Sequence, residues 1–270
     1  MHNTAVRSRG GSLVINIINI SGHITHLPPQ PRSESRIIGG VDAPEQYAPY
    51  MVSLSIGELH VCGGSLVSQR LVLTAAHCIT SFIQPNGTLA SFFYGRVGSN
   101  NWKIGGFIIR FSAHYIHPLY DEVNIKNDIA VLKTTHPLEL NENVAVIALD
   151  FRWVGGNERA FVTGWGRTGP NLMQLLDVLT LSHLQCISKM EAMSNRGSMP
   201  FIDAKIEICT FLSVGHGMCH GDSGSPVVVS STRAQIGIVT WGIPCARGGP
   251  DVHGRISGHK DFLIPILSHG

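Results

Sequence analysis

The sequence has few charged side chains and no long apolar run, and both shortages exclude classes of protein. Asp, Glu, Lys and Arg make up only 14% of the 270 residues and hydrophobic residues make up 43%, so a wholly disordered chain is excluded. The 20 basic and 18 acidic residues leave a formal net charge of +2, which is too balanced for a protein that binds nucleic acid or a membrane surface. No stretch approaches the ~18 apolar residues of a membrane span. We therefore expect no nucleic acid and no membrane among its partners.

Motifs for metal binding are also missing. The chain has no Cys-x-x-Cys pair, which argues against a structural zinc site. Residues 59–120 contain no Asp or Glu, so a calcium site rich in carboxylate oxygens cannot be built there. The sequence therefore predicts no metal site and no cofactor.

The cysteines are even in number and spread along the chain, which fits three disulfides. They are Cys62, Cys78, Cys186, Cys209, Cys219 and Cys245. Spacing alone leaves their pairing open, and six free thiols in a cytosolic protein are the alternative. If the bonds form, the protein matures in an oxidising compartment.

The first 36 residues differ in composition from the rest. Arg7 and Arg9 precede a short apolar run, residues 13–20, that two asparagines interrupt, which is the outline of a weak secretory signal. Residues 23–36 are rich in Pro, His, Ser and Arg and have no periodic apolar positions. We expect residues 1–36 to form a leader and activation peptide, and a wrongly assigned start is the alternative.

From residue 37 onward, short apolar runs are separated by turns rich in Gly, Pro and Asn. The 30 glycines and 14 prolines favour turns and strands over long helices. Many short strands without helical periodicity between them predict an all-β protein of barrels or sandwiches. The expected strands are 51–56, 65–67, 71–75, 107–111, 128–132, 160–163, 225–229 and 235–240. The best candidate for a helix is 262–267, near the C-terminus.

Three motifs place reactive side chains beside apolar runs or in a glycine-rich loop. His77 ends Leu-Thr-Ala-Ala-His, Asp128 begins Asp-Ile-Ala-Val-Leu, and Ser223 lies in Gly-Asp-Ser-Gly. Alone, each has an ordinary structural explanation, because such residues also serve as a packed core histidine, a turn aspartate and a tight turn. Their combination and their order along the chain are far more specific.

In this order the motifs resemble those of the chymotrypsin-like (trypsin-fold) serine protease family. The matching segments cover essentially all of residues 37–270; they are 37–40 (Ile-Ile-Gly-Gly), 62–66, 74–78, 127–132, 163–166, 221–226 and 240–242. The resemblance implies an all-β fold of two six-stranded antiparallel β-barrels with a short C-terminal helix. It places one barrel in 37–150, and the second barrel with the helix in 151–270.

The same resemblance implies a serine endopeptidase that hydrolyses peptide bonds through an acyl-enzyme. A serine hydroxyl is a weak nucleophile and needs a neighbouring base, which a neutral histidine can supply. Ser223 would be the nucleophile, His77 the general base and acid, and Asp128 the carboxylate that orients the imidazole. The backbone N–H groups of Gly221 and Ser223 would form the oxyanion hole.

Activation by proteolysis is also implied. Cleavage after Arg36 by a trypsin-like protease would free the amine of Ile37, which would pair with the carboxylate of Asp222. Burial of that carboxylate without a partner would cost several kcal/mol, so the intact chain is expected to be a zymogen. His60 matches a position that often holds the aspartate in the inactive form, and an ordinary strand histidine is the alternative.

The resemblance further implies the disulfides Cys62–Cys78, Cys186–Cys209 and Cys219–Cys245, and it implies a specificity pocket. The expected pocket residues are Gly217, Thr240, Trp241, Gly242 and Asp251. Gly217 stands where trypsins carry an aspartate, and Asp251 stands where many relatives have glycine. This combination of a glycine and an aspartate resembles the brachyurin or chymotrypsin-like subgroup. A carboxylate there would attract basic side chains while still admitting apolar ones. We expect broad or chymotrypsin-like cleavage that tolerates Arg and Lys.

The expected protein is a secreted monomer whose partners are protein or peptide substrates, an activating protease and protein inhibitors. Its alternative is a catalytically silent homologue that acts as a binding or regulatory protein, but all three catalytic positions are present. A non-peptidase esterase would lack an edge that binds peptides, whereas residues 240–242 resemble the strand that pairs with substrate backbone. Asn86-Gly87-Thr88 is an acceptor motif for glycosylation.

Overall fold

The computed structural model describes residues 37–166, 171–193 and 200–269. The described residues belong to one compact unit, Glu34–Gly270. The expected leader and activation peptide, with Arg36, lies outside the described residues. Among those described, no helix has the length and apolar character needed to cross a membrane.

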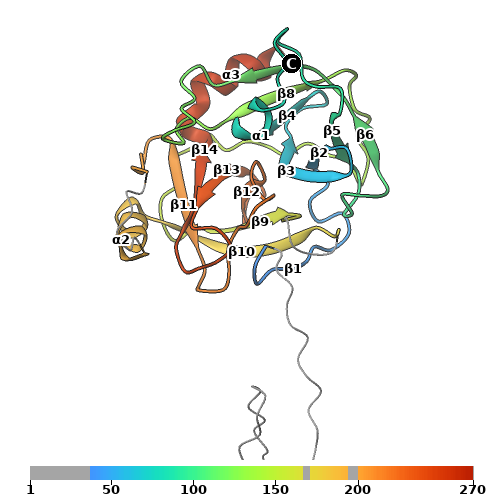
Figure 1. Cartoon of the computed structure of the whole chain (residues 1–270). Helices are drawn as coiled ribbons and strands as arrows, with labels where there is room; N and C mark the ends of the chain where they lie inside the picture. Colours follow the sequence, from blue (N-terminus) through green and yellow to red (C-terminus); the bar gives the residue numbers. More distant parts are fainter. Residues whose placement is uncertain (1–36, 167–170, 194–199, 270) are drawn as a thin grey trace, which may run out of the picture. The chain divides into compact units, whose positions relative to one another are not determined.

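Two antiparallel sheets lie next to each other in Figure 1. The first has the strand order β6-β5-β2-β3-β4-β8-β7. Its strands are β2 (Met51–Ile56), β3 (Leu59–Leu66), β4 (Leu71–Thr74), β5 (Phe93–Val97), β6 (Phe107–Ile109), β7 (Phe111–Ile116) and β8 (Ala130–Thr134). Its edge strands β6 and β7 are separated in the chain by Arg110 alone, so the sheet curls round to bring its two edges together.

The second sheet closes into a six-stranded barrel. Its order is β1-β10-β11-β14-β13-β12-β9, and an additional pairing of β10 with β9 completes the ring. Its strands are β1 (Val41–Asp42), β9 (Arg159–Gly164), β10 (Gln174–Leu181), β11 (Glu207–Phe211), β12 (Pro226–Val229), β13 (Gln235–Gly242) and β14 (Asp251–Arg255). The short β1 pairs with β10, so the segment that follows residue 40 joins the second sheet.

The strands form because their side chains alternate or are wholly apolar. In β5 and β10 buried and more exposed positions alternate, as expected for strands with one face on a core. In β4 and β12 every residue is buried, because other parts of the chain cover both faces. The predicted all-β class is confirmed, with the second sheet closed into a six-stranded barrel and the first sheet forming a half-barrel.

Helices are few and short: α1 (His77–Thr80), α2 (His183–Met193), the 3-10 turn η1 (Ile256–His259) and α3 (Lys260–Ser268). Helix α3 confirms the predicted C-terminal helix. Its Leu263 packs with Leu71 and Val131 of the first sheet and with Ile238 of the second, so this helix joins the two barrels (Figure 1).

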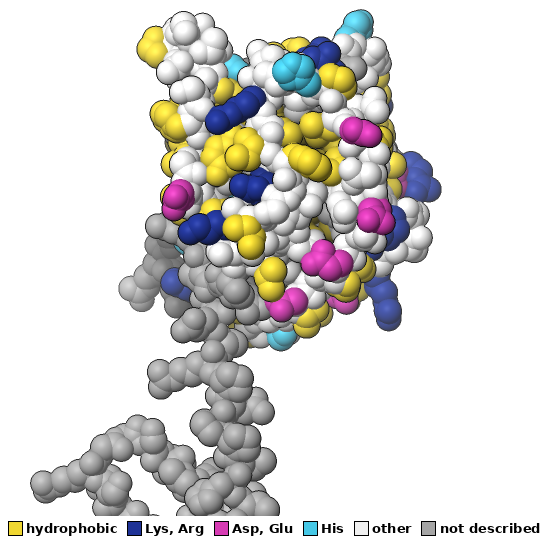
Figure 2. All heavy atoms as spheres, turned by 90° about the vertical axis from the view of Figure 1, so that its right-hand side faces the viewer, with side chains coloured by type: hydrophobic (Ala, Val, Ile, Leu, Met, Phe, Trp, Pro, Cys, Tyr) yellow, Lys and Arg dark blue, Asp and Glu magenta, His cyan; other side chains and the backbone are white. Residues whose placement is uncertain are grey.

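The outer surface around β5 and β6 mixes apolar and charged side chains. Figure 2 shows hydrophobic, basic and acidic groups interspersed on this face. Phe107 and Ile108 of β6 are 62% and 54% exposed, and Lys103 pairs loosely with Glu58 nearby in the fold, at 3.9 Å.

Candidate active site

Strand pairing brings His77 and Asp128 together. Strand β4 ends at Thr74, which pairs with Ala130 at the start of β8. Because the strands are antiparallel, the residues that follow β4 and those that precede β8 leave the sheet at the same place. His77 begins α1 just after β4, and Asp128 lies just before β8.

Both oxygens of Asp128 hold His77. Oδ2 lies 2.6 Å from Nδ1 of the imidazole, and Oδ1 accepts the backbone N–H of His77 at 2.9 Å. Asp128 is only 3% exposed. Because a carboxylate can only accept, the imidazole donates from Nδ1, and its Nε2 is left to act as a base.

The pKa of His77 is raised above the ordinary value of 6.5. Burial of the ring opposes protonation, but the hydrogen bond to Asp128 and the charge of Asp128 favour the imidazolium, with a smaller contribution from Glu122. The imidazole also lies close to the sulfur atoms of Cys62 and Cys78, which are joined in a disulfide and offer no thiolate to a metal ion.

The loop that carries Ser223 is held against the first barrel. The carbonyl oxygen of Ser223 accepts the N–H of Gly63 at 2.7 Å. Gly224 has a φ of +80°, and a Cβ there would lie 2.3 Å from the Thr74 hydroxyl and from the Gly63 oxygen. Only glycine fits so close an approach. The serine loop therefore packs against Thr74, which precedes His77 by three residues in the sequence.

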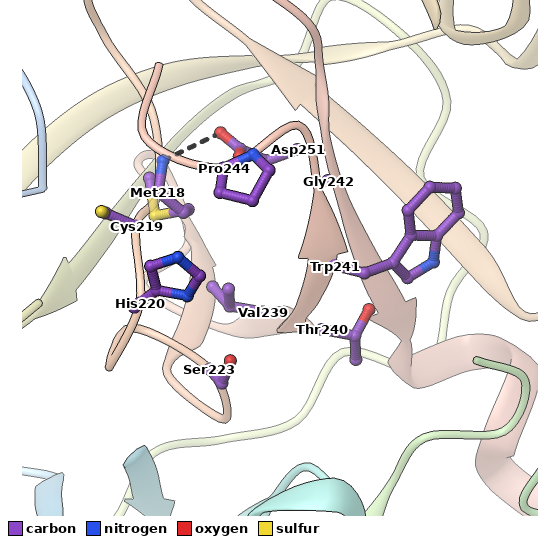
Figure 3. Close-up of a pocket in the computed structure, with 10 residues that line it drawn as sticks. All are labelled: Met218, Cys219, His220, Ser223, Val239, Thr240, Trp241, Gly242, Pro244 and Asp251. Atoms are coloured by element: carbon purple, nitrogen blue, oxygen red, sulfur yellow. Dashed lines mark hydrogen bonds between the residues drawn. The ribbon is translucent and has the colours of Figure 1, made fainter. Parts of the chain in front are cut away.

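Of the three predicted catalytic side chains, the structure therefore joins two by hydrogen bonds. Among the described residues, no hydrogen bond links the Ser223 hydroxyl to His77. Ser223 instead points into the pocket drawn in Figure 3. Catalytic hydrogen bonds are often long in unliganded sites and tighten with substrate, so this geometry is compatible with a serine nucleophile.

Asp222 is fully buried and bonded only by backbone N–H groups in the described part of the chain. Its Oδ1 accepts from Gly166 at 2.9 Å, and its Oδ2 accepts from Cys219 at 3.0 Å. Burial raises the pKa of Asp222 to about 7 in spite of these bonds. Ile37 is 1% exposed, so the segment expected to supply a cation is already packed inside the protein.

His60 does not hold Asp222. Its Nε2 donates to the carbonyl oxygen of Gly221 at 2.9 Å, and its Nδ1 lies 2.8 Å from the Ser53 hydroxyl. Burial lowers the pKa of His60 to about 4, so the ring is neutral at pH 7. It fixes the loop at Gly221, whose φ of +93° favours glycine.

The pocket beside Ser223 has a volume of about 220 Å³. It is lined by Met218, Cys219, His220, Ser223, Val239, Thr240, Trp241, Gly242, Pro244 and Asp251. Four of the five predicted pocket residues line it directly. The fifth, Gly217, lies alongside, because a Cβ at this position would stand 3.0 Å from Asp251 Oδ2. Sequence reasoning missed Met218, His220, Val239 and Pro244, whose only signal was their closeness to the motifs.

Asp251 lies at the end of the pocket opposite Ser223 (Figure 3). It is 6% exposed, and its Oδ2 accepts the N–H of Met218 at 3.1 Å. Burial and the charge of Asp222 raise the pKa of Asp251 to about 8, although the Met218 bond opposes the rise. Near pH 7 most molecules therefore carry a neutral acid at this end of the pocket.

The disulfides brace these loops. The structure joins Cys62 to Cys78, Cys186 to Cys209 and Cys219 to Cys245, the pairs that the resemblance implied. The first pair ties β3 to the turn that carries His77, and the third ties the segment before Ser223 to the far wall of the pocket. Each closed loop would stabilise the fold by roughly 2–4 kcal/mol.

Comparison with known proteins agrees with this geometry. Residues 37–263 match the family model named Trypsin. The chain is 34% identical over 239 residues to "Trypsin 5G1" of Aedes aegypti, which covers 87% of this chain and 86% of that protein. It is 32% identical over 259 residues to "Hypodermin-A" of Hypoderma lineatum (93% and 95%) and 33% identical over 246 residues to "Trypsin II-P29" of Gallus gallus (87% and 90%). The chain therefore belongs to the trypsin family, and it is a serine endopeptidase of the trypsin fold.

Proposed function

We propose that this endopeptidase cleaves peptide bonds with Ser223 as nucleophile, His77 as general base and acid, and Asp128 as the orienting carboxylate. The observation that carries the proposal is the double hydrogen bond of Asp128 to His77, beside the loop that presents Ser223 to an open pocket. The N–H groups of Gly221 and Ser223 would stabilise the oxyanion of the tetrahedral intermediate. The acyl-enzyme on Ser223 would then be hydrolysed by water that His77 activates.

We further propose that the protein is made as a zymogen. Cleavage after Arg36 would turn the buried N–H of Ile37 into an ammonium group, and Asp222 would become its partner. Ile38 and Gly217 already exchange two backbone hydrogen bonds, at 2.9 and 3.1 Å, so the new terminus would be tethered to the segment that precedes the pocket. A charge pair would replace a buried carboxyl group that has only backbone donors.

Labelling of Ser223 by an organophosphonate is the test of this function. After nicking with trypsin, we expect stoichiometric labelling at Ser223, since only an activated serine attacks the phosphorus. The Arg36→Gln variant should stay uncut and label at least 100-fold more slowly, because an unpaired buried carboxylate costs about 3–5 kcal/mol. A catalytically silent homologue would not label in either state, and equal labelling of both forms would contradict the zymogen.

The pH dependence of the activity should follow the protonation of the His77 imidazole. Its raised pKa means that activity falls as the pH drops through a value above the ordinary 6.5, because only the neutral imidazole can accept the serine proton. The measurement is kcat/KM against pH for a substrate with an uncharged side chain before the scissile bond. An acid limb centred well below 6.5 would show that Asp128 does not stabilise the imidazolium.

The pocket would give the enzyme a broad preference of the brachyurin type. Val239 and Pro244 supply apolar walls, and Asp251 supplies one carboxyl group at the far end. With the pKa of Asp251 raised to about 8, the pocket is mostly uncharged at neutral pH and accepts apolar side chains. Loss of the proton would create a counter-charge for Arg or Lys.

The ratio of cleavage after Arg to cleavage after Leu should therefore rise with pH. Between pH 6.5 and 9 we expect an increase of about tenfold, because the ionised form of Asp251 becomes dominant only near pH 8 and above. Paired peptides that differ only in this residue would give the ratio of kcat/KM values. In Asp251→Asn the ratio should be low and flat, and a persistent rise in this variant would assign the effect to another group.

The setting of the enzyme follows from the same proposal. A secreted monomer would meet protein substrates, an activating trypsin-like protease and protein inhibitors. Its leader and activation peptide would be 1–36, and the two barrels would occupy 37–150 and 151–270, apart from β1, which pairs with β10 of the second sheet. Three disulfides fit an oxidising compartment.

A further inference from the structure

A buried acid outside the predicted catalytic set, Glu207, bonds to a side chain of each barrel. It begins β11 and is 4% exposed. Its Oε1 accepts hydrogen bonds from Lys126 Nζ and from Trp241 Nε1, both at 2.9 Å. Its Oε2 accepts from Lys126 Nζ at 3.0 Å and from the N–H of Asp203 at 2.7 Å. One carboxylate thus holds an ammonium group and an indole at the same time.

Lys126 reaches Glu207 from a constrained loop of the other barrel. It lies two residues before Asp128 and exchanges two backbone hydrogen bonds with Asp121, at 2.9 and 3.0 Å. Ile125 and Asn127, on either side of it, have φ values of 52° and 51°. Side-chain-bearing residues rarely adopt this left-handed conformation, and surrounding contacts must stabilise it. The loop therefore holds Lys126 in one place, with its side chain 15% exposed.

Trp241 is the part of this cluster that faces substrate. It lies on β13, whose residues 240–242 line the pocket and would pair with the backbone of a bound peptide. Figure 3 shows its indole turned away from His220 and the pocket interior. A peptide that paired with β13 would pass this indole with the residues that precede the scissile bond. Lys126 Nζ is 5.4 Å from the centre of the ring, a cation–π distance.

We propose that Glu207 sets the preference of the subsite upstream of the main pocket, by cancelling the charge of Lys126 and fixing the indole of Trp241. With the charge cancelled, this subsite favours apolar side chains and gives no advantage to acidic ones. The inference rests on the proposed function, because it requires a peptide that extends from Ser223 along β13. Glu207 is a positioning residue, since it acts through its two partners.

The test removes the charge of Glu207 and keeps the shape of its side chain. In Glu207→Gln the amide oxygen can still accept from Trp241, but Lys126 loses its counter-ion and should attract acidic side chains. The substrates are peptides that carry Leu, Asn or Asp at the second, third or fourth position before the scissile bond. We expect the Asp-to-Leu ratio of kcat/KM to rise about tenfold at low salt, mainly through KM, and the rise to shrink near about 1 M salt because screening weakens the attraction.

For a second variant we expect the opposite change in the Asp-to-Leu ratio of kcat/KM. Lys126→Gln leaves the Glu207 carboxylate uncompensated, so the Asp-to-Leu ratio should fall below that of the unsubstituted enzyme. The double variant Lys126→Gln/Glu207→Gln has neither charge and should return the ratio to its starting value. Glu58→Gln, which removes an exposed acid paired with Lys103 at 3.9 Å, is the matched control and should leave the ratio unchanged.

The outcomes separate this proposal from the proposed function. If Ser223 labels fully but both single variants keep the original ratio, or lose activity equally on all substrates, Glu207 has only a structural role and the proposal is overturned. Absence of labelling at Ser223 in the unsubstituted, nicked protein would instead refute the proposed function. Should Glu207→Gln not fold, the fall expected for Lys126→Gln still decides the matter.

Discussion

Replacing Ser223 with alanine is expected to lower kcat of the activated enzyme on the order of 10⁶-fold. The hydroxyl is the group that would form the acyl-enzyme, and no other side chain in the described pocket is a serine. The fold should survive the change, because the bond that anchors this loop runs from the backbone oxygen of Ser223 to Gly63 at 2.7 Å. Kinetics with a peptide substrate, beside a thermal unfolding curve, would measure both effects.

Ser225→Ala is the matched control for this experiment. Ser225 lies two residues away, is fully buried and has a hydroxyl with no hydrogen-bond partner among the described residues. Its removal should leave kcat close to the original value and need not destabilise the protein, since an unsatisfied buried hydroxyl is unfavourable. If Ser225→Ala lost activity while Ser223→Ala retained it, the nucleophile would be misassigned.

The second large effect is expected for Asp128→Asn, which should lower kcat about 10⁴-fold near neutral pH. The carboxylate accepts from the imidazole Nδ1 at 2.6 Å and thereby keeps the proton on that nitrogen. An amide in its place can donate to Nδ1, which moves the ring proton to Nε2 and removes the base. With the amide nitrogen in the place of Oδ2, the amide oxygen can still accept the backbone N–H of His77, so the local fold should persist.

The pH profile distinguishes this mechanism from simple damage to the site. Because Asp128 is what raises the pKa of His77, the variant's residual activity should have its acid limb at lower pH than that of the unsubstituted enzyme. Asp121→Asn, a change at a half-buried residue in the loop that leads to Asp128, is the control and should keep both rate and profile. An unchanged acid limb in Asp128→Asn would mean that another group titrates.

Local patterns predicted eight of the fourteen described strands and the C-terminal helix, but missed the other six strands and the helices α1 and α2. Runs such as 51–56 and 235–240 became β2 and β13, because alternation and β-branched residues act over a few neighbours. Helix α2 was not predicted, since it buries only Cys186 and Met190 and has little apolar periodicity. Its position depends on the disulfide to Cys209 in β11, a contact 23 residues away in the sequence.

The position of β1 shows a second limit of sequence reasoning. Residues just after the Ile-Ile-Gly-Gly motif were expected to lie in the first barrel's part of the chain, but Val41 and Asp42 pair with β10 of the second sheet. A two-residue strand has no periodicity of its own. Its partner is decided by the burial of Ile37 and by the backbone hydrogen bonds of Ile38 to Gly217, which are matters of long-range packing.

By itself, the sequence determined the β class and the terminal helix, and it singled out His77, Asp128 and Ser223 as the catalytic candidates. Short motifs and alternating hydrophobicity are local properties, so they can be read without the fold. Only the tertiary structure decided that His60 bonds to Gly221 and that Glu207 pairs with Lys126, 81 residues away. It also decided that Asp251 is buried deeply enough to hold its proton near pH 7. Charge state and hydrogen-bond partner depend on the atoms that surround a group, and in a two-barrel fold those atoms come from distant parts of the chain.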